Sequence, residues 1–330
     1  MSRDTSTGTS TSTSNVPMTM MALRAHIRGG PEVLVHESAP VPVPGPDEVL
    51  LEVRAAAITF TELTWDETWH RDGVDRTPII PGHEVSGVVA VLGGPGLGFE
   101  VGDEVYGLIR FDRDGAAAEY VAVPAADLAP APRSTTHVEA AALPLAALTA
   151  WQALYDRAGL RRGEDVLVHG GAGGVGAFAV QLAQTAGAHV TSTARAADVD
   201  LVGRLGAERV VDYEHQAFDE GGRAFDVVLD TVGGETLDRS FDVLRPGGRL
   251  VTLQAPPSEE RARAAGVEAI FFIVSPDRAE LTALAELVDS DGLEVLVAAE
   301  FPLAAGRAAF QSVSNPQRRA GKTVLVVRDA

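Results

Sequence analysis

A cluster of glycines near the middle of the chain has the spacing Gly171-x-Gly173-x-x-Gly176. An apolar segment, residues 166–168, precedes it, and residues 177–183 carry apolar side chains at helical spacing, which predicts a strand, a tight turn and a helix. In that context the glycines make the turn, admit a pyrophosphate and let helix and strand pack closely. Backbone N–H groups around Gly174 and Val175, together with the helix dipole, would then hold the anion. A glycine-rich packing turn without a ligand is the alternative.

The next predicted strand, residues 189–194, runs directly into Arg195. Sites for NAD usually place an acid at this tip, where it binds the ribose hydroxyls. Here the first acids, Asp198 and Asp200, come later, in the first turn of a predicted helix, where they suit the helix dipole. Because a guanidinium makes paired hydrogen bonds to a phosphate, the pattern favours NADPH over NADH. The alternative is an exposed arginine without that role.

Bulk composition limits the classes of protein that fit this chain. Its 330 residues, 45% of them apolar, are enough for two domains with substantial cores. A net charge of −19 argues against nucleic acid or an anionic membrane as the main partner. The absence of cysteine excludes disulfides, thiolate catalysis and cysteine-ligated zinc. No apolar run is long enough to cross a bilayer and no signal-peptide pattern is present, so we expect a cytoplasmic protein.

The pattern of predicted elements changes near residue 139. Short strand-like segments between Pro and Gly turns come first, as in a small barrel. Strands and helices then alternate, which predicts an α/β domain with a doubly wound parallel sheet. Within it, a helix is predicted over residues 236–244, where Arg245-Pro246-Gly247-Gly248 should stop it. The Ser/Thr-rich residues 1–17 are predicted to be a disordered extension.

Further motifs follow one another in a recognisable order. They are Pro81-Gly82-His83-Glu84-x-x-Gly87-Val88-Val89, Gly102-Asp103-Glu104-Val105-Tyr106-Gly107, Ala118-Glu119-Tyr120-Val121, Leu148-Thr149-Ala150, Leu205-Gly206-Ala207, Val211-Asp212-Tyr213, Asp230-Thr231-Val232-Gly233-Gly234 and Gly321-Lys322. With these motifs the chain resembles the medium-chain dehydrogenase/reductase superfamily, and more narrowly its zinc-free quinone oxidoreductase (zeta-crystallin-like) branch. The resemblance implies a GroES-like catalytic domain, residues 18–138 and 291–330, around a Rossmann NADPH-binding domain, residues 139–290. It also implies an active site in the cleft between the domains and a possible homodimer.

Zinc is not expected. In alcohol dehydrogenases of this superfamily the Gly82-His83-Glu84 motif carries a zinc-binding histidine, and cysteines stand where this chain has Thr59 and, nearby, Leu145. One histidine and one glutamate do not make a three-ligand catalytic site. His83 is therefore read as a hydrogen-bonded structural histidine, with a metal ligand as the alternative. Without a Lewis acid, acceptors that take hydride easily are favoured, namely quinones and α,β-unsaturated carbonyls.

The resemblance also assigns residues to the cofactor site. Tyr213 matches a tyrosine beside the 2′-phosphate, Thr149 a threonine at the nicotinamide–phosphate end, and Lys322 a neighbour of the cofactor. The remaining matches are Asp230 and Val232 at the end of a central strand, and Phe272 and Val274 near the nicotinamide. For three of these residues there is also an interpretation that involves no cofactor: strand-edge packing for Tyr213, a helix-interior hydroxyl for Thr149 and a buried strand for Phe272.

Candidate catalytic residues are fewer. Thr59 and Thr61 stand where relatives have an Asn-Pro-x-Asp-like segment, and their hydroxyls are candidates for hydrogen bonds to a carbonyl or to the nicotinamide amide. Tyr106, with Trp65 and Trp69, is a candidate aromatic wall for a flat substrate, the alternative being core packing. No proton donor stands out. The predicted function is hydride transfer from NADPH to a quinone or enone. The alternatives are a dedicated enoyl reductase of secondary metabolism and a non-catalytic NADPH-binding protein.

Overall fold

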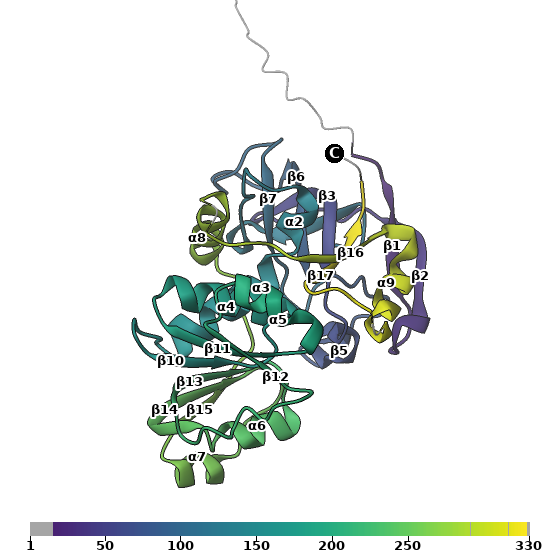
Figure 1. Cartoon of the computed structure of the whole chain (residues 1–330). Coiled ribbons are helices and arrows are strands. Elements are labelled where there is room, and N and C mark those ends of the chain that lie inside the picture. The colour runs from purple at the N-terminus through teal and green to yellow at the C-terminus, as the bar shows by residue number, and fades with distance from the viewer. Residues whose placement is uncertain (1–15, 291, 316, 329–330) are drawn as a thin grey trace, which may run out of the picture.

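The computed structural model describes residues 16–290, 292–315 and 317–328. Two large sheets organise the chain, one above the other in the view of Figure 1. Most of the segment predicted to be disordered, residues 1–17, lies outside the described residues. None of the helices formed by the described residues has the length and apolar character needed to span a lipid bilayer.

The lower sheet is parallel and has six strands in the order β12-β11-β10-β13-β14-β15. Counted from β10, this is the strand order of dinucleotide-binding folds. Its strands are β10 (Asp165–Val168), β11 (His189–Ala194), β12 (Arg209–Asp212), β13 (Phe225–Asp230), β14 (Leu244–Thr252) and β15 (Glu268–Phe271). We call the part of the molecule built on it the parallel-sheet half. The expected Rossmann fold is confirmed.

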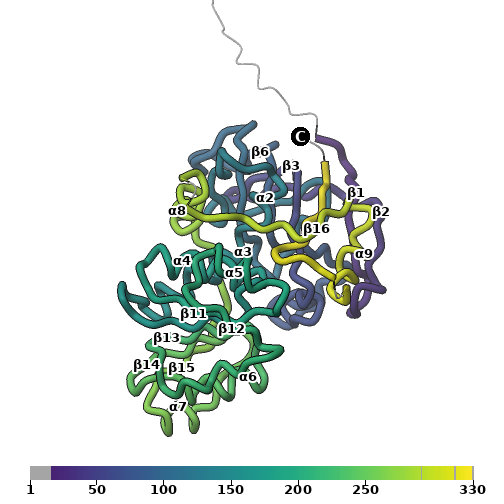
Figure 2. Tube along the Cα trace, viewed as in Figure 1, coloured from purple at the N-terminus to yellow at the C-terminus, as the bar shows by residue number. Residues whose placement is uncertain are grey.

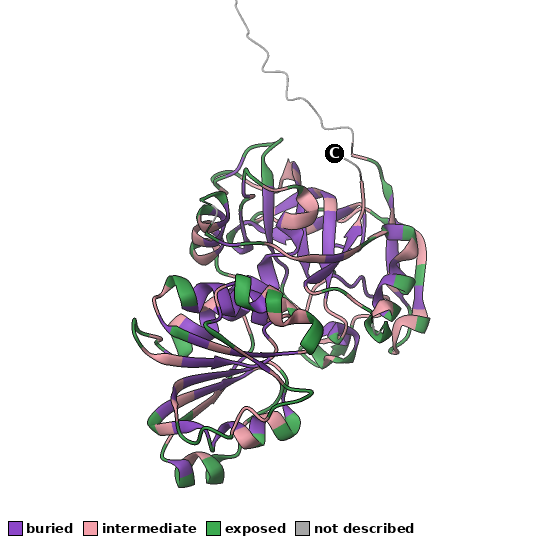
Figure 3. Ribbon diagram, in the orientation of Figure 1, coloured by how far each residue is buried: buried purple, intermediate pink, exposed green. Residues whose placement is uncertain are grey.

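Helices cover both faces of this sheet, so its central strands are buried on both sides (Figures 1 and 3). Val166, Leu167 and Val168 of β10 have no exposed surface, which explains their continuous apolar run. One face carries α3 (Pro144–Trp151), α4 (Gly174–Thr185) and α5 (Val199–Arg204); the other carries α6 (Gly234–Ser240) and α7 (Glu259–Ala265).

The helix predicted over residues 236–244 is wrong at its C-terminal end. α6 ends at Ser240, and β14 begins at Leu244. Leu244 is fully buried and pairs with Phe225 of β13, so burial against the sheet outweighs the helical pattern. The segment 245–248 lies inside β14, where Gly247 takes a positive φ of 81° and the register against β13 shifts.

The upper, seven-stranded sheet defines the β-rich half. Its strand order is β16-β17-β3-β6-β7-β9, with β8 also paired to β3. The strands are β3 (Glu48–Ile58), β6 (Glu84–Leu92), β7 (Glu104–Leu108), β8 (Tyr120–Pro124), β9 (Leu128–Pro130), β16 (Val297–Pro302) and β17 (Lys322–Val326). β17 pairs antiparallel with β3, so residues near the two ends of the sequence lie side by side (Figure 2).

Smaller elements complete this half. They are the hairpins β1 (Thr19–Ala25) with β2 (Leu34–Pro40) and β4 (His70–Arg71) with β5 (Val74–Asp75), and the helices α1 (Asp66–Trp69), α2 (His137–Ala141) and α9 (Gly306–Gln311).

Helix α8 (Arg278–Asp289) joins the two halves. It follows β15 in the chain but lies beside the β-rich half (Figure 1). The Tyr106 hydroxyl of β7 donates to the Leu281 carbonyl of α8, and Arg278 Nε donates to the Leu128 carbonyl of β9 at 2.7 Å. The Arg278 guanidinium also lies over the Phe99 ring, 4.2 Å from its centre. These contacts fix the orientation of one half relative to the other.

The hydroxyl of Tyr106 is fully buried, and replacing it should destabilise the protein. We expect Tyr106→Phe to lower the free energy of unfolding by about 1 kcal/mol, because the Leu281 carbonyl loses a buried donor. Denaturant titration measures the change. Tyr120→Phe is the control, since it removes the same hydroxyl from another buried tyrosine, which is 6% exposed. Equal stability of Tyr106→Phe and the native protein would contradict the proposed contribution of this bond.

Candidate cofactor and active site

The predicted glycine turn links β10 to α4. Gly170 takes a φ of +76°, which favours glycine. A β-carbon on Gly176 would lie 2.1 Å from the Gly170 carbonyl oxygen, and one on Gly171 would lie 2.1 Å from Ser192 Oγ. Only glycine therefore allows helix α4 to approach the strands this closely. α4 begins at Gly174, after Gly173 as its N-cap, and its first N–H groups, including those of Gly174 and Val175, have no acceptor within the helix. This is the geometry of an anion site.

The turn after β13 lies next to the glycine turn, because β10 and β13 are neighbours in the sheet. The order of the strands reverses here, which is where open α/β sheets bind ligands. Asp230 is completely buried; its carboxylate accepts from the N–H groups of Val232 and Gly233 and from the Thr252 hydroxyl, each at 3.0 Å. The carboxylate of Asp230 is thus used within the protein and shapes the turn, and a contact of this residue with the cofactor stays a prediction. Val232 remains 53% exposed at this turn.

The tip of β11 carries a compact charged cluster. Arg195 donates through both Nε and Nη2 to one Asp198 oxygen, at 3.0 and 2.7 Å, and this pairing raises the pKa of Arg195. The side chain of Arg195 is 37% exposed and that of Asp198 only 14%. Arg318 lies close by: its backbone carbonyl is 3.4 Å from Arg195 Nη2, and burial together with Arg195 lowers the pKa of its guanidinium. Tyr213, at the end of β12, is 53% exposed. Asp198 thus stands where a phosphate would pair with Arg195.

Residues expected at the nicotinamide end are mostly buried. Thr149 is 6% exposed, and its hydroxyl donates to the Leu145 carbonyl one turn earlier in α3, as the ordinary reading of a helical threonine predicts. Phe272 is 8% exposed and packs in the core beneath Arg157, while Val274 is half-buried. The side chains at these positions can form the walls of a ligand site. The Thr149 hydroxyl already donates its proton to the Leu145 carbonyl.

A second polar cluster, the Lys322 cluster, consists of Lys322, Thr59 and Glu84. Lys322 is 7% exposed; its ammonium forms an ion pair with Glu84 and donates to Thr59 Oγ1 at 3.1 Å. Glu84 is 1% exposed and also accepts from the Leu145 N–H at 3.0 Å. Burial raises the pKa of Glu84, and the ammonium opposes that rise. The cluster therefore connects the ends of β3, β6 and β17 to the start of α3.

The Lys322 side chain also reaches the glycine turn. A β-carbon on Gly174 would lie 3.1 Å from Lys322 Cδ. The glycine at this position therefore gives the lysine stem room beside the N-terminus of α4. The Lys322 cluster and the anion site are adjacent, although they belong to different halves of the molecule.

Glu62 and His83 form a buried pair beside the Lys322 cluster. Glu62 is 1% and His83 is 2% exposed, with Glu62 Oε2 lying 3.6 Å from His83 Nε2. Burial raises the pKa of Glu62 to about 8 and lowers that of His83 to about 3, so both are uncharged at neutral pH. Glu62 also accepts from the Gly82 N–H at 3.0 Å. Neither ring nitrogen of His83 has a hydrogen-bond partner among the described residues, so the expected hydrogen-bonded histidine is instead held by packing against Phe111.

The remaining catalytic candidates separate in the structure. Thr61 is exposed, and its carbonyl accepts from the Thr64 hydroxyl. The expectation that Tyr106 faces a substrate is wrong, because the side chain has no exposed surface and its hydroxyl is bound by α8. Trp69 is 1% exposed and donates to the Leu63 carbonyl. Trp65 is half-buried against Phe111, with ring centres 4.9 Å apart. The predicted aromatic wall is reduced to Trp65.

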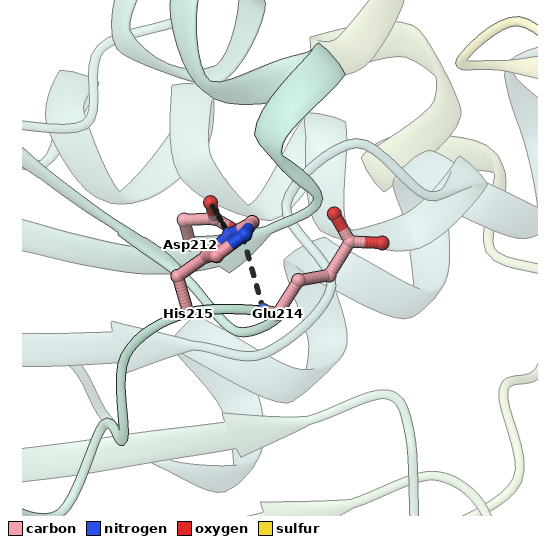
Figure 4. Close-up of side chains that lie close together, drawn as sticks. All are labelled: Asp212, Glu214 and His215. Atoms are coloured by element: carbon pink, nitrogen blue, oxygen red, sulfur yellow. Dashed lines mark hydrogen bonds and ion pairs between the residues drawn. The ribbon is translucent and has the colours of Figure 1, made fainter.

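One group of metal-ligand side chains is close together within the described part of the chain. Asp212, Glu214 and His215 follow β12 (Figure 4). Asp212 accepts from the Glu214 N–H at 3.1 Å and pairs with the His215 ring at 2.7 Å, so the group closes a turn on itself. Glu214 and His215 are exposed, as in an ordinary solvated turn. His83 belongs to no such group.

Glu62 and Arg318 were not foreseen as members of the site. Glu62 has little signal, since it lies four positions after the apolar segment 55–58, in a stretch of mixed polar and apolar residues. Arg318 has none, because only the fold brings it to the tip of β11.

Known proteins with a similar sequence or structure were found. Residues 45–133 match the alcohol dehydrogenase GroES-like domain and residues 205–325 the zinc-binding dehydrogenase domain. A probable zinc-binding mitochondrial oxidoreductase of Arthroderma benhamiae is 33% identical over 89% of this chain and 93% of its own length. The 2-methylene-furan-3-one reductase of Solanum lycopersicum is 37% identical over 74% of this chain and 64% of its own length. The quinone oxidoreductase of Coxiella burnetii has a TM-score of 0.86 and 29% identity, covering 94% of this chain and all of that one.

The buried carboxyl of Glu62 should make stability depend on pH. Its pKa is about 8 in the folded protein against an ordinary 4.5, so between these values the folded state holds a proton that the unfolded chain has lost. The free energy of unfolding therefore falls as pH rises through this window. We expect Glu62→Gln, which has no proton to lose, to gain stability relative to the native protein by on the order of 2 kcal/mol between pH 5 and pH 9.

Denaturant titration at pH 5, 7 and 9 measures this difference. Glu67→Gln, on the exposed face of α1, is the control and should follow the native protein at each pH. A Glu62→Gln difference that stays constant across the range would show that the folded protein does not hold this proton.

Proposed function

Because the chain belongs to the quinone-oxidoreductase-like branch of the medium-chain dehydrogenase/reductase superfamily, we propose that it is an NADPH-dependent reductase that transfers hydride to a quinone or an α,β-unsaturated carbonyl compound. One observation carries the proposal. The anion site at the start of α4 touches the buried Lys322 cluster of the other half, so a nucleotide on the glycine turn would have its reactive end beside Thr59 and Lys322.

The residues present fit a nicotinamide dinucleotide. When bound, the cofactor supplies a hydride at C4 of the nicotinamide. The N–H groups of Gly174, Val175 and Gly176 are proposed to hold the pyrophosphate, with Gly171 and Gly173 shaping the turn. Arg195 and Tyr213 are proposed to flank the 2′-phosphate, while Val232, Phe272 and Val274 bound the nicotinamide riboside and exclude water.

Zinc does not fit the residues at the family's metal positions. Thr59 offers a hydroxyl that already accepts from Lys322, Leu145 offers no donor, and His83 is a lone imidazole. A cation also stands between Thr59 and Glu84, where it would repel a metal ion. We therefore propose a zinc-independent reaction in which the acceptor delocalises its own negative charge.

A dedicated enone acceptor is the second candidate within the same chemistry. It is supported by the similarity to the tomato 2-methylene-furan-3-one reductase, whose name describes an enone substrate. Quinones and enones therefore belong in the same assay.

We also propose a homodimer that forms through the edge of the parallel sheet. β15 is the edge strand, and Phe271 and Ile273 at its end are 37% and 57% exposed. Pairing of two such edges would cover both side chains.

Catalysis should be measurable as NADPH oxidation at about 340 nm with 1,4-benzoquinone, 9,10-phenanthrenequinone and small enones. We expect turnover with at least one acceptor, unchanged after dialysis against a chelator, because no residue set here requires zinc. Loss of activity with a stoichiometric metal would contradict zinc independence. Tight NADPH binding without turnover of any acceptor would instead support a non-catalytic nucleotide-binding protein.

Cofactor preference should depend on the pair at the tip of β11. Asp198 accepts hydrogen bonds from the guanidinium N–H groups of Arg195 that a 2′-phosphate would need, and its negative charge repels the phosphate. Asp198 should therefore weaken the preference for NADPH over NADH. We expect Asp198→Asn to raise the ratio of kcat/KM for NADPH over NADH by about 10-fold and Arg195→Ala to lower it by a similar factor. Glu208→Gln, exposed at the far end of β11, is the matched control. Equal ratios in all three variants would mean that the 2′-phosphate is bound elsewhere.

A further inference from the structure

The proposed reduction needs a proton as well as a hydride, and this inference rests on that proposed function. Hydride addition to an enone leaves an electron pair on the carbonyl oxygen, and a proton donor must reach that oxygen. The source must be a group with a transferable proton, held beside the glycine turn and connected to solvent through a second group.

Thr59 satisfies the first requirement. It follows β3, is half-buried, and its hydroxyl accepts a hydrogen bond from Lys322 Nζ at 3.1 Å. An accepting hydroxyl has its own proton free to donate onward. Lys322 also lies against the start of α4, where a β-carbon on Gly174 would be 3.1 Å from Lys322 Cδ. Thr59 and the start of α4 therefore both contact Lys322.

Lys322 satisfies the second requirement. The chain has 27 basic residues, and Lys322 is the one lysine among them. Arginine is always charged in proteins and cannot release a proton at accessible pH, whereas an ammonium can. The one lysine of the chain thus occurs at the position whose side chain donates to the Thr59 hydroxyl.

The ammonium has one charged partner. Glu84 from β6 forms the ion pair, while Glu62, which follows β3, is uncharged at neutral pH. Lys322 is only 7% exposed, so reloading of its amine from water is assigned to the step after the product leaves. Among the other titratable groups, Glu62 accepts from the Gly82 N–H through Oε2 and from the Thr59 backbone N–H, not its hydroxyl, through Oε1 at 3.4 Å. His83 touches neither Thr59 nor Lys322 among the described hydrogen bonds.

We propose that Thr59 is the proton donor to the acceptor oxygen and that Lys322 restores its proton. The acceptor gains the hydride at carbon, and its carbonyl π bond shifts an electron pair to oxygen. The Thr59 O–H bond breaks as a new O–H bond forms on the acceptor, giving an enol or a hydroquinone. An N–H bond of Lys322 breaks to rebuild the Thr59 hydroxyl, and the neutral amine takes a proton from water. The enol then becomes the saturated ketone in solution.

Three variants test the proposal. Lys322→Arg keeps the positive charge but has no transferable proton, while Thr59→Val removes the hydroxyl and Thr59→Ser keeps it. We expect kcat for an enone to fall about 100-fold in Lys322→Arg and in Thr59→Val, and to stay within a few-fold in Thr59→Ser. Quinone reduction should fall much less, because the hydroquinone anion spreads its charge over a ring and takes its proton from water.

Binding and protonation are measured separately. NADPH affinity, followed by fluorescence, should be retained in Lys322→Arg and Thr59→Val, and Thr64→Val, exposed in the turn beside Thr61, is the control for folding and activity. Because Lys322 is unique, protein with ¹⁵N-labelled lysine gives one side-chain resonance, whose titration should move when Thr59 becomes valine. The pH profile of enone reduction should follow that titration in the native protein and lose it in Lys322→Arg.

Three results would overturn the inference. They are native enone turnover in Lys322→Arg, equal losses for quinone and enone, and loss of NADPH affinity that accounts for the whole effect. The last two would make Lys322 a cofactor-binding group. Failure of the proposed function looks different, since the native protein would then reduce neither acceptor.

Discussion

A buried ion pair between Lys322 and Glu84 holds together the part of the molecule where the chemistry is expected. Both groups are almost fully removed from water, and an ammonium or carboxylate alone in such a place is costly, so each requires the other. Glu84 further binds the start of α3, and Lys322 binds Thr59. One pair of opposite charges therefore fixes the ends of β3, β6 and β17 against the helix that leads into the parallel sheet.

The uncharged pair beside it follows from the same low-polarity surroundings. Glu62 and His83 have no counter-ion of their own, so burial shifts both pKa values toward the neutral forms. A charge on Glu62 or on His83 would change the electrostatic potential at Lys322. The site thus contains one matched pair of charges within a neutral polar shell, which is the environment in which a single ammonium exerts a strong and directed effect.

The sequence predicted those elements whose pattern is local. β11 has the predicted bounds, and the glycine turn lies where its spacing requires, because both depend on neighbours in the chain. The end of α6 was missed because Leu244 is drawn into the sheet by a partner on β13. Tyr106 was misjudged for a similar reason. Alternation along β7 does not show that α8, 175 residues later, covers the tyrosine.

Side-chain pairing was the least predictable level. Arg195 was predicted to bind a phosphate, yet Asp198, only three residues away, already accepts hydrogen bonds from its guanidinium. The sequence shows both residues but not which rotamers bring them together. The Lys322 contact with Thr59 spans 263 positions, and no periodicity signals a contact of that range.

That separation has a consequence for the order in which the molecule is made. The ribosome releases Thr59 and Glu84 long before Lys322, so Glu84 has no counter-ion from Lys322 until β17 is synthesised and inserts beside β3. Before that moment the β-rich half lacks the strand that lies between β16 and β3, and Glu84 lacks its cation. The ion pair and the hydrogen bond to Thr59 therefore form only with the last of the described strands, although their partners in β3 and β6 are made early.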